Sequence, residues 1–429
     1  MYVSRVRVDG VLGFHGDRAV DLTLTRPDGS HAGWTVLAGR NGSGKTTLLR
    51  AVAIALSPPA QAYPLAPDLQ SWQSAAPGRI DLTVALDDAD AELLPPDASA
   101  ERSLDVACLW VPVRGRDHVQ RPQMSWWQRT SDSGAPLDDG EWDMLTAGSL
   151  AGYGAFRRLA RESAPGTPAF TTLFDDDATL GDGIPWLVAE HHRSLEGREG
   201  ASQTVEDVLD LLGDGLLPDG LRAVRVDSEG LWVEQGGHEF ALRELSGGHR
   251  TAVALVLNLL WEFRLLERRG DRMVMPLPGV VLIDEIDAHL HVTWQQRIGE
   301  WLKAHFPHVQ FIVSTHSPYV CQAADPGGLI LLGTPGDGTA PAVASEELYQ
   351  RVVYGSGDDA ILSELFGLES PYSLVAEGAR RRIGDLEGRV LSGDASDAEL
   401  AEYEELSRKL NSSLSARVDE VAARLARPE

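Results

Sequence analysis

The chain has 429 residues, of which 43% are hydrophobic, so it is long enough for two or three domains and apolar enough for a large core. Its formal net charge of −26 excludes a protein that coats itself non-specifically in nucleic acid. Its two cysteines, Cys108 and Cys321, provide neither a disulfide framework nor a metal set. Met1 to Val8 alternates like a strand rather than a signal peptide, and no apolar run approaches the roughly 20 residues of a membrane span. We therefore expect a cytoplasmic protein with no membrane partner.

The first strongly patterned segment is a glycine-rich loop between a predicted strand and a predicted helix. Trp34 to Leu37 is an apolar run typical of a buried strand, and residues 39–46 read G-x-x-x-x-G-K-T, a phosphate loop. The glycines let backbone N–H groups turn inward around triphosphate oxygens, and a helix over Thr46 to Leu56 adds its positive N-terminal end. Lys45 would bridge the β- and γ-phosphates, and the Thr46 hydroxyl would hold Mg²⁺. The predicted ATP-binding residues of this loop are Gly39, Arg40, Asn41, Gly42, Ser43, Gly44, Lys45, Thr46 and Thr47.

Two glutamines precede the next predicted strand, Ile80 to Leu86, where a nucleotide-sensing metal ligand would fall. We favour Gln73 over Gln70 as that ligand, and plain loop is the alternative for both.

The middle of the chain is harder to interpret. Residues 87–150 are acidic and turn-rich, residues 184–213 read as helices, and Leu221 to Val233 alternates like a hairpin. No long heptad tract lies between residues 46 and 245, which excludes a long coiled-coil rod. Arg157, in the stretch Gly152 to Arg158, could contact nucleotide or partner, or could share an exposed helix face with Arg158 and Arg161.

Residues 245–250 read Leu-Ser-Gly-Gly-His-Arg and precede a predicted helix over Thr251 to Phe263. A serine and bare backbone at a helix N-terminus form an anion site. Within one chain that site would duplicate the phosphate loop, so it predicts two ATPase heads that close face to face on ATP.

Two further apolar strands end in reactive side chains. Val280 to Ile283 leads into Asp284 and Glu285, at the strand end where ligands bind in α/β sheets. Asp284 can hold Mg²⁺, and Glu285 can polarise the attacking water as general base. Phe311 to Val313 leads into His316, which would lie beside the two carboxylates and contact the γ-phosphate. Lys45, Glu285 and His316 are thus the predicted catalytic residues, and Thr46, Asp284 and Gln73 the predicted Mg²⁺ ligands.

The order of these motifs, with Asp287-Ala288-His289-Leu290-His291 after the Asp-Glu pair, resembles the ABC-type ATPases of the RecF, SMC and OLD group. Transporter ATPases usually carry a Pro-Thr-Ser-type stretch there. The resemblance implies that Ser246, Gly247 and Gly248 reach the γ-phosphate held by the partner protomer, and that Asp287 lies in the loop crossing the dimer seam. It therefore implies a homodimer through an ATP sandwich and leaves a higher oligomer open.

The stretch Gly152 to Arg158 is similar to a segment of the stand-alone Septu-type ATPases of this group, which work beside a separately encoded nuclease in defence against phage. We expect no OLD-type nuclease domain here, because Val375 to Gly378 is followed by polar residues at helical spacing. Any nuclease would be another polypeptide.

The tail is predicted to be helical, with a break at Gly393 and Asp394 and a capping box of Ser396 and Glu399. A later helix is expected around Leu414 to Leu425. The predicted fold is an α/β ABC-type P-loop head, two-lobed, with a mixed sheet flanked by helices, a helical insertion and C-terminal helices. The expected divisions are 1–90 (first lobe), 91–240 (insertion, turn-rich and helical), 241–345 (second lobe) and 346–429 (helical tail).

These motifs predict an ATPase that dimerises on ATP with Mg²⁺ as cofactor, as the regulatory subunit of an antiphage complex with a separate nuclease. One alternative is a RecF-like DNA repair ATPase, which would need a basic strip such as Arg264, Arg268, Arg269 and Arg272 or Arg380 to Arg382. Another is a nucleotide-sensing scaffold that does not hydrolyse ATP, which Glu285 and His316 disfavour.

Overall fold

The computed structural model describes residues 1–74, 77–87, 90, 103–113, 121–130, 142, 146, 150–159, 169–180, 183–217, 220–263, 266–269, 272–334, 336, 338–361, 363–366, 370 and 372–410. The chain divides into two compact units, Met1–Phe366 and Gly367–Glu429. Within the described residues, no helix is both long enough and apolar enough to cross a membrane.

The centre of the first unit is a mostly parallel sheet whose strand order is β18-β17-β3-β16-β15-β7. Only the edge pair β17–β18 is antiparallel among these strands. Continuous apolar runs allow the middle strands to be buried on both faces, as parallel sheets require. The bounds are β3 (Trp34–Ala38), β7 (Leu150–Tyr153), β15 (Gly279–Ile283), β16 (Val309–Thr315), β17 (Leu329–Leu331) and β18 (Ala342–Val343).

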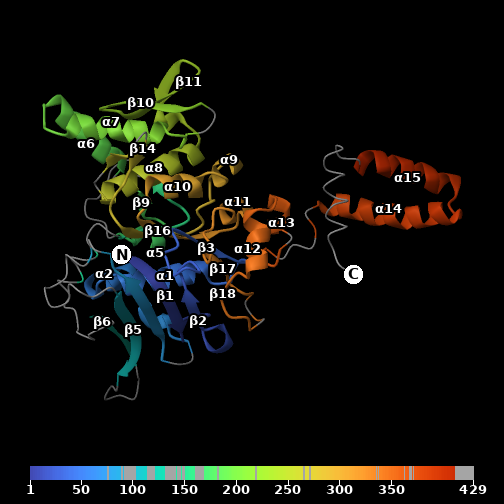
Figure 1. Cartoon of the computed structure of the whole chain (residues 1–429), viewed down its shortest axis with the longest axis horizontal. Helices are drawn as coiled ribbons and strands as arrows, with labels where there is room; N and C mark the ends of the chain where they lie inside the picture. Colours follow the sequence, from blue (N-terminus) through green and yellow to red (C-terminus); the bar gives the residue numbers. More distant parts are fainter. Residues whose placement is uncertain are drawn as a thin grey trace. The chain divides into compact units, whose positions relative to one another are not determined.

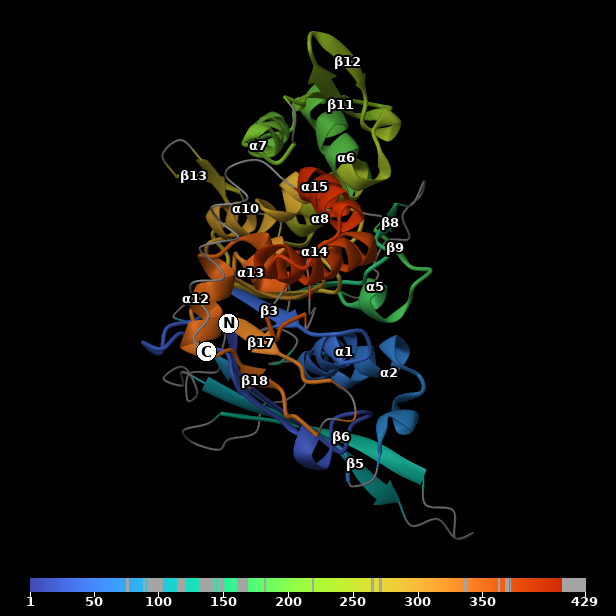
Figure 2. The same ribbon diagram turned by 90° about the vertical axis from the view of Figure 1, so that its right-hand side faces the viewer.

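Alternate residues of this sheet enter different hydrophobic clusters. Val280 and Leu282 point into a cluster with α1 (Lys45–Leu56), whereas Val281 and Ile283 point into one with α8 (Gly247–Phe263) and α10 (Ile298–His305). Figures 1 and 2 show α1 on one side of the sheet and α8 and α10 on the other. The sheet is therefore fixed from both faces, and its carboxyl edge is a rigid platform.

An antiparallel sheet with strand order β2-β1-β4-β5-β6 lies on the α1 side (Figure 2). Its strands are β1 (Tyr2–Asp9), β2 (Val20–Thr23), β4 (Arg79–Ala85), β5 (Ser103–Val113) and β6 (Arg121–Thr130). The segment 91–240, expected to be turn-rich and helical, thus also supplies β5 and β6 to this sheet and β7 to the parallel one. The expected helices of residues 184–213 are present as α6 (Gly183–Leu195) and α7 (Ala201–Gly213).

Shorter elements complete the first unit. The hairpin expected from Leu221 onward is a sheet of β10 (Arg222–Asp227), β11 (Gly230–Gln235) and β12 (His238–Ala241). The remaining described elements are α2 (Pro59–Leu65), α5 (Thr171–Phe174), α9 (Val292–Gln295), α11 (Pro318–Cys321), α12 (Glu346–Val353), α13 (Gly357–Ile361), β8 (Arg158–Leu159), β9 (Thr179–Leu180), β13 (Glu267–Arg269), β14 (Arg272–Val274) and the 3-10 helices η1 (Gly16–Arg18), η2 (Leu69–Trp72) and η3 (Leu242–Glu244).

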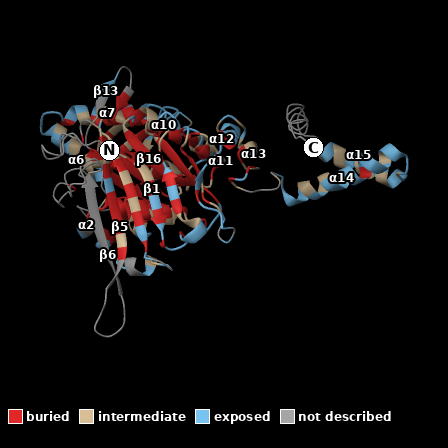
Figure 3. Ribbon diagram, turned by 60° about the horizontal axis from the view of Figure 1, so that its bottom comes forward, coloured by how far each residue is buried: buried red, intermediate tan, exposed pale blue. Residues whose placement is uncertain are grey.

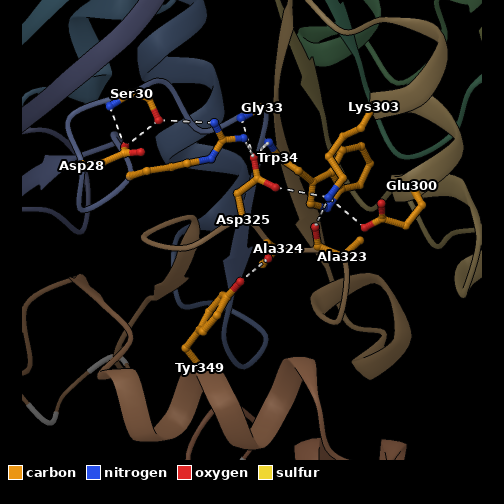
Figure 4. A network of polar contacts seen from close by, with 11 residues as sticks. Asp28, Ser30, Gly33, Trp34, Glu300, Lys303, Ala323, Ala324, Asp325 and Tyr349 are labelled. Atoms are coloured by element: carbon orange, nitrogen blue, oxygen red, sulfur yellow. Dashed lines mark hydrogen bonds and ion pairs between the residues drawn. The ribbon is translucent and has the colours of Figure 1, made fainter.

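A buried carboxylate joins the start of β3 to its surroundings (Figure 4). Asp325 accepts hydrogen bonds from the Gly33 N–H at 2.7 Å, the Arg26 guanidinium at 2.7 Å and the Lys303 ammonium at 3.2 Å. Burial alone would raise the pKa of Asp325, but Lys303 and Arg26 together hold it below its usual value. The carboxylate therefore connects three segments that are far apart in sequence.

The second unit contains α14 (Leu374–Ser392) and α15 (Asp397–Leu410). Gly393 ends α14 with a left-handed φ of 78°. Ser396 and Glu399 form the expected capping box, in which the Ser396 N–H donates to the Glu399 carboxylate at 2.9 Å and the Glu399 N–H donates to the Ser396 hydroxyl at 3.4 Å. Figure 3 shows mostly exposed and half-buried residues along both helices, in contrast to β16, which is buried along its length. The helix expected around Leu414 to Leu425 lies outside the described residues.

Candidate functional site

The phosphate loop follows β3 and leads into α1. Gly39, Gly42 and Gly44 all have positive φ, at 155°, 75° and 102°. A side chain at Gly39 would lie 2.7 Å from the Leu332 carbonyl, and one at Gly44 would lie 2.6 Å from the Phe14 ring. Both backbone conformation and space therefore require glycine at these two positions. Phe14 is 1% exposed and packs against this loop.

Lys45 begins α1 and lies inside the loop. Its ammonium donates to the carbonyls of Gly39 at 2.8 Å and Arg40 at 3.2 Å. Burial lowers the pKa of this ammonium, while the neighbouring carboxylates, led by Asp284, act in the opposite direction. The structure thus brings the predicted phosphate-binding lysine near the predicted metal ligand Asp284 and the predicted general base Glu285.

Thr46 and Asp284 meet at the carboxyl edge of the sheet. The Thr46 hydroxyl donates to one Asp284 oxygen at 2.7 Å, and the Ser314 hydroxyl donates to the other at 2.5 Å. Hydroxyl and carboxylate oxygens are the ligands that Mg²⁺ takes in phosphate-loop sites. This pair of oxygens therefore fits the predicted metal.

Glu285 and His316 flank that pair on neighbouring strand ends. Glu285 has a positive φ of 45°, and its N–H donates to the Ser314 hydroxyl at 2.7 Å. The side chain of His316 is half-buried, and its pKa is lowered by burial and by the positive charge of Lys45. That lowered pKa favours a neutral imidazole at neutral pH.

Asp287 lies in the same loop as Glu285. It accepts hydrogen bonds from the Thr315 hydroxyl at 2.5 Å and from the His316 N–H at 3.2 Å. The loop that carries Glu285 is thus joined to the end of β16 at both Ser314 and Thr315. Sequence reasoning missed these two hydroxyl groups, although a Ser-Thr pair closing an apolar strand is a visible signal.

The Leu-Ser-Gly-Gly segment forms the start of α8. Ser246 is exposed, and its hydroxyl is 2.7 Å from Nδ1 of His249. A side chain at Gly248 would lie 2.1 Å from the His289 carbonyl, so Gly248 lets the segment approach the loop after β15. Beside it is a pocket of about 400 Å³, lined by Ser246, Gly248, His249, His289, Leu290, His291 and Trp294.

The other predicted residues are placed as follows. Arg40, Asn41 and Gly42 are exposed on the phosphate loop. Ser43 is buried, Thr47 is half-buried in α1, and Gly247 is the exposed first residue of α8. Gln73 is half-buried, and its backbone pairs with that of Val11. Val11 also pairs with Phe14, whose ring packs against Gly44, so Val11 links Gln73 to the phosphate loop.

Arg157 corrects one of the alternatives given for its stretch. It is 3% exposed, so it does not belong to an exposed helix face, and its guanidinium donates to the carbonyls of Asp284 and Glu285. Arg158 lies in β8, and Arg161 is outside the described residues.

This arrangement has the mixed α/β fold of the SMC-type ABC ATPase head. The match covers 81% of this chain and 99% of an SMC head solved in complex with the C-winged helix domain of ScpA, with a TM-score of 0.51 at 19% identity. The phosphate loop of such an ATPase implies ATP as the nucleotide.

The relatives of the chain are more specific. Residues 169–322 match the family described as "AAA domain, putative AbiEii toxin, Type IV TA system". The chain is 41% identical over 104 residues to "Retron Ec83 probable ATPase" of Escherichia coli, covering 24% of this chain and 19% of that protein. It is 25% identical over 317 residues to Septu protein PtuA of Bacillus mycoides (strain KBAB4), covering 72% of this chain and 37% of that protein. The chain is thus similar to an AAA-domain family over residues 169–322 and to the retron and Septu ATPases over the stretches given, and its matches span less than half of those relatives.

Proposed function

We propose that the chain hydrolyses ATP at the carboxyl edge of its parallel sheet. The observation that carries this proposal is the hydrogen bond from Thr46 to Asp284, which joins the phosphate loop to the loop after β15 that carries Asp284 and Glu285. Mg²⁺ held by these two residues, with Gln73 as a further ligand, would neutralise charge on the phosphates. Lys45 would hold the β- and γ-phosphates.

Glu285 is proposed to orient and deprotonate the attacking water, since it directly follows the metal ligand and its backbone is held by Ser314. His316, with its lowered pKa, would contact the γ-phosphate as a neutral hydrogen-bonding group. These roles rest on geometry and on residue chemistry together.

We further propose that hydrolysis requires two copies of the chain. Ser246 is exposed at the start of α8 beside an open pocket, where an anion brought by another molecule could bind. In the resulting homodimer, Ser246, Gly247 and Gly248 of one protomer would bind the γ-phosphate on its partner. Asp287 would lie near the seam, because its loop contacts the strand end that carries His316.

In the cell, we propose that this ATPase acts in the cytoplasm as the regulatory subunit of an antiphage complex with a separately encoded nuclease. Its relation to retron and Septu ATPases supports that role. The RecF-like alternative gains little support from the arginines considered for a DNA strip. Arg268 pairs with Asp210, Arg381 with Glu377 and Arg382 with Glu402.

The proposal is tested with Glu285→Gln expressed beside its native flanking genes. We expect wild-type protein to hydrolyse ATP and Glu285→Gln to bind ATP with at least 100-fold slower turnover, trapped as a dimer visible by light scattering. Ser246→Ala in that background should stay monomeric. Unchanged turnover in Glu285→Gln would reject the catalytic assignment, whereas absence of turnover in the wild-type protein would favour the scaffold alternative.

The same preparation identifies the partner. A stoichiometric protein with nuclease-type residues, detected by mass spectrometry, is the expected companion. A dimer carrying DNA alone would favour the repair-type alternative instead.

A further inference from the structure

Arg157 reaches the catalytic loop from a neighbouring strand. It follows β7, which runs parallel to β15, so the two strands end at the same edge of the sheet. Its guanidinium donates to the Asp284 carbonyl at 3.0 Å, the Glu285 carbonyl at 2.8 Å and the Ala288 carbonyl at 3.1 Å. One buried side chain thus binds backbone on both sides of the general base.

The partners of Arg157 are backbone carbonyls rather than a carboxylate. Burial lowers the pKa of Arg157 to about 10, and the charges of the acidic side chains on the same loop, Asp287 first, act in the opposite direction. The group therefore stays charged at neutral pH. A planar guanidinium with donors in fixed directions can bind several carbonyls at once, which a lysine ammonium on a flexible stem does less well.

The bound loop has an unusual backbone conformation. Glu285 and His289 have positive φ values of 45° and 66°, although neither is glycine. Such conformations persist only where the surroundings hold them, and Arg157 binds the carbonyl of Glu285 itself. The arginine therefore acts on the conformation of the residue proposed to be the general base.

The stretch before Arg157 has the small residues that this approach requires. A side chain at Gly154 would lie 2.0 Å from the Thr172 carbonyl, and one at Gly152 would lie 2.4 Å from the Phe170 ring. Tyr153 between them donates its hydroxyl to Asn258 of α8 at 2.9 Å. This segment thus packs against α5 and α8 and directs Arg157 beneath the loop.

We propose that Arg157 is a positioning residue that holds Glu285 and Asp287 in their hydrolytic arrangement, so that turnover depends on it and ATP affinity does not. This inference rests on the proposed ATP hydrolysis. At 3% exposure and with its donors engaged by the chain's own backbone, Arg157 is directed toward the loop rather than toward a partner protein.

The test compares Arg157→Gly with wild type, because glycine accepts the φ of 37° at this position. Arg198→Gly is the matched control, since Arg198 is 68% exposed in the turn between α6 and α7. We expect kcat of Arg157→Gly to fall at least 30-fold, with the Kd for ATP within threefold of wild type. Guanidinium ion at non-denaturing concentration should restore part of kcat, whereas equal sodium chloride should not. Arg157→Lys should remain well below wild type.

A second measurement does not depend on turnover. Amide hydrogen exchange over residues 284–290 should accelerate at least tenfold in Arg157→Gly and stay unchanged in Arg198→Gly. A kcat within threefold of wild type, a loss confined to ATP affinity, or unchanged exchange would overturn the inference. Failure of both Arg157 variants to fold, even with guanidinium present, would make the role structural and overturn it as well. If wild-type protein does not hydrolyse ATP, the proposed function fails, and exchange alone decides whether Arg157 positions the loop.

Discussion

Gly44 is one of the two phosphate-loop positions, with Gly39, at which backbone conformation and space both require glycine. Its φ of 102° is strained for other residues, and the ring of Phe14 occupies the space that a side chain would need. Gly29 has a φ of 84° with nothing within 4 Å of the position where a side chain would start. A substitution at Gly29 therefore tests backbone strain alone, whereas a substitution at Gly44 tests backbone strain together with crowding against Phe14.

We expect Gly44→Ala to abolish measurable ATP binding, because relieving the contact with Phe14 must displace the loop. Gly29→Ala should cost about 1 kcal/mol of stability and leave ATP affinity unchanged. Isothermal titration with ATP and Mg²⁺, together with thermal unfolding, measures both effects. ATP binding by Gly44→Ala within threefold of wild type would contradict the prediction.

The Ser314 hydroxyl holds two neighbouring residues of the site in place. It donates to the Asp284 carboxylate and accepts a hydrogen bond from the Glu285 N–H. We predict that Ser314→Ala slows hydrolysis about 10-fold to 100-fold and raises the Mg²⁺ concentration needed for half-maximal rate. The reason is that the proposed metal ligand Asp284 and the proposed general base Glu285 both lose a fixed partner. The readout is a steady-state Mg²⁺ titration.

Ser57→Ala is the control for Ser314→Ala. Ser57 is equally buried, but it donates to the Ala53 carbonyl at the end of α1. It should cost about 1 kcal/mol of stability with no change in Mg²⁺ dependence. Equal effects of the two variants on hydrolysis would argue against a specific role for Ser314.

Residues whose proposed role follows from the spacing of their sequence neighbours could be predicted from the sequence. Lys45 and Thr46 belong to one loop pattern, and Asp284 ends one apolar run, so neighbouring residues were enough. Ser314 and Arg157 depend on contacts across 30 and 127 residues. Such contacts exist only once β7, β15 and β16 lie side by side. The Ser-Thr pair that closes β16 is visible in the sequence, but the residues that it contacts are not.

Among the elements, β7 illustrates the same limit. Leu150-Ala151-Gly152-Tyr153 contains a glycine and is too short for a clear alternation. It is a strand because β15 pairs with it in parallel, from Val280 with Leu150 to Ile283 with Tyr153. By contrast, the capping box of α15 was predictable, since its residues lie within one turn.

The Asp325 contacts give an element-scale prediction that depends on pH. We expect Asp325→Asn to destabilise the chain by about 2 kcal/mol at pH 7, because Lys303 and Arg26 lose the carboxylate that pairs with them. The folded pKa of Asp325 lies below that of an unfolded aspartate, about 3.9. Its contribution is therefore present above about pH 4 and is lost as pH falls through the folded pKa.

Urea unfolding at pH 7, 5 and 3 measures this difference. The difference in unfolding free energy between wild type and Asp325→Asn should be the same at pH 7 and pH 5 and should become smaller at pH 3. Asp21→Asn serves as control, since its pair with Arg5 is exposed and should contribute less than about 1 kcal/mol. If that difference grows as the pH falls, the predicted direction of the pH dependence is wrong.

At the scale of the whole molecule, the hydrophobic clusters on either side of the parallel sheet draw their residues from Met1 to Leu365. The second unit contributes none of those described cluster residues, and Leu386 is buried within it. The first unit should therefore depend on its own residues for stability, whatever the C-terminal helices contact in the cell.

We predict that a chain ending at Phe366 folds, binds ATP and unfolds within about 3 °C of the full chain, because no described core residue is removed. A chain ending at Val353 is the matched control. It loses Ala360 and Leu365, which are 0% and 2% exposed, and should be destabilised by about 3 kcal/mol or more. Differential scanning calorimetry and ATP titration of both truncations decide the matter.

If the chain ending at Phe366 aggregates or loses ATP binding, residues 367–429 are part of the folding unit, and the boundary drawn from internal packing is wrong. If it folds but no longer retains the partner that co-purifies with the full chain, the exposed Leu374, Val375 and Leu391 of α14 become the first residues to substitute.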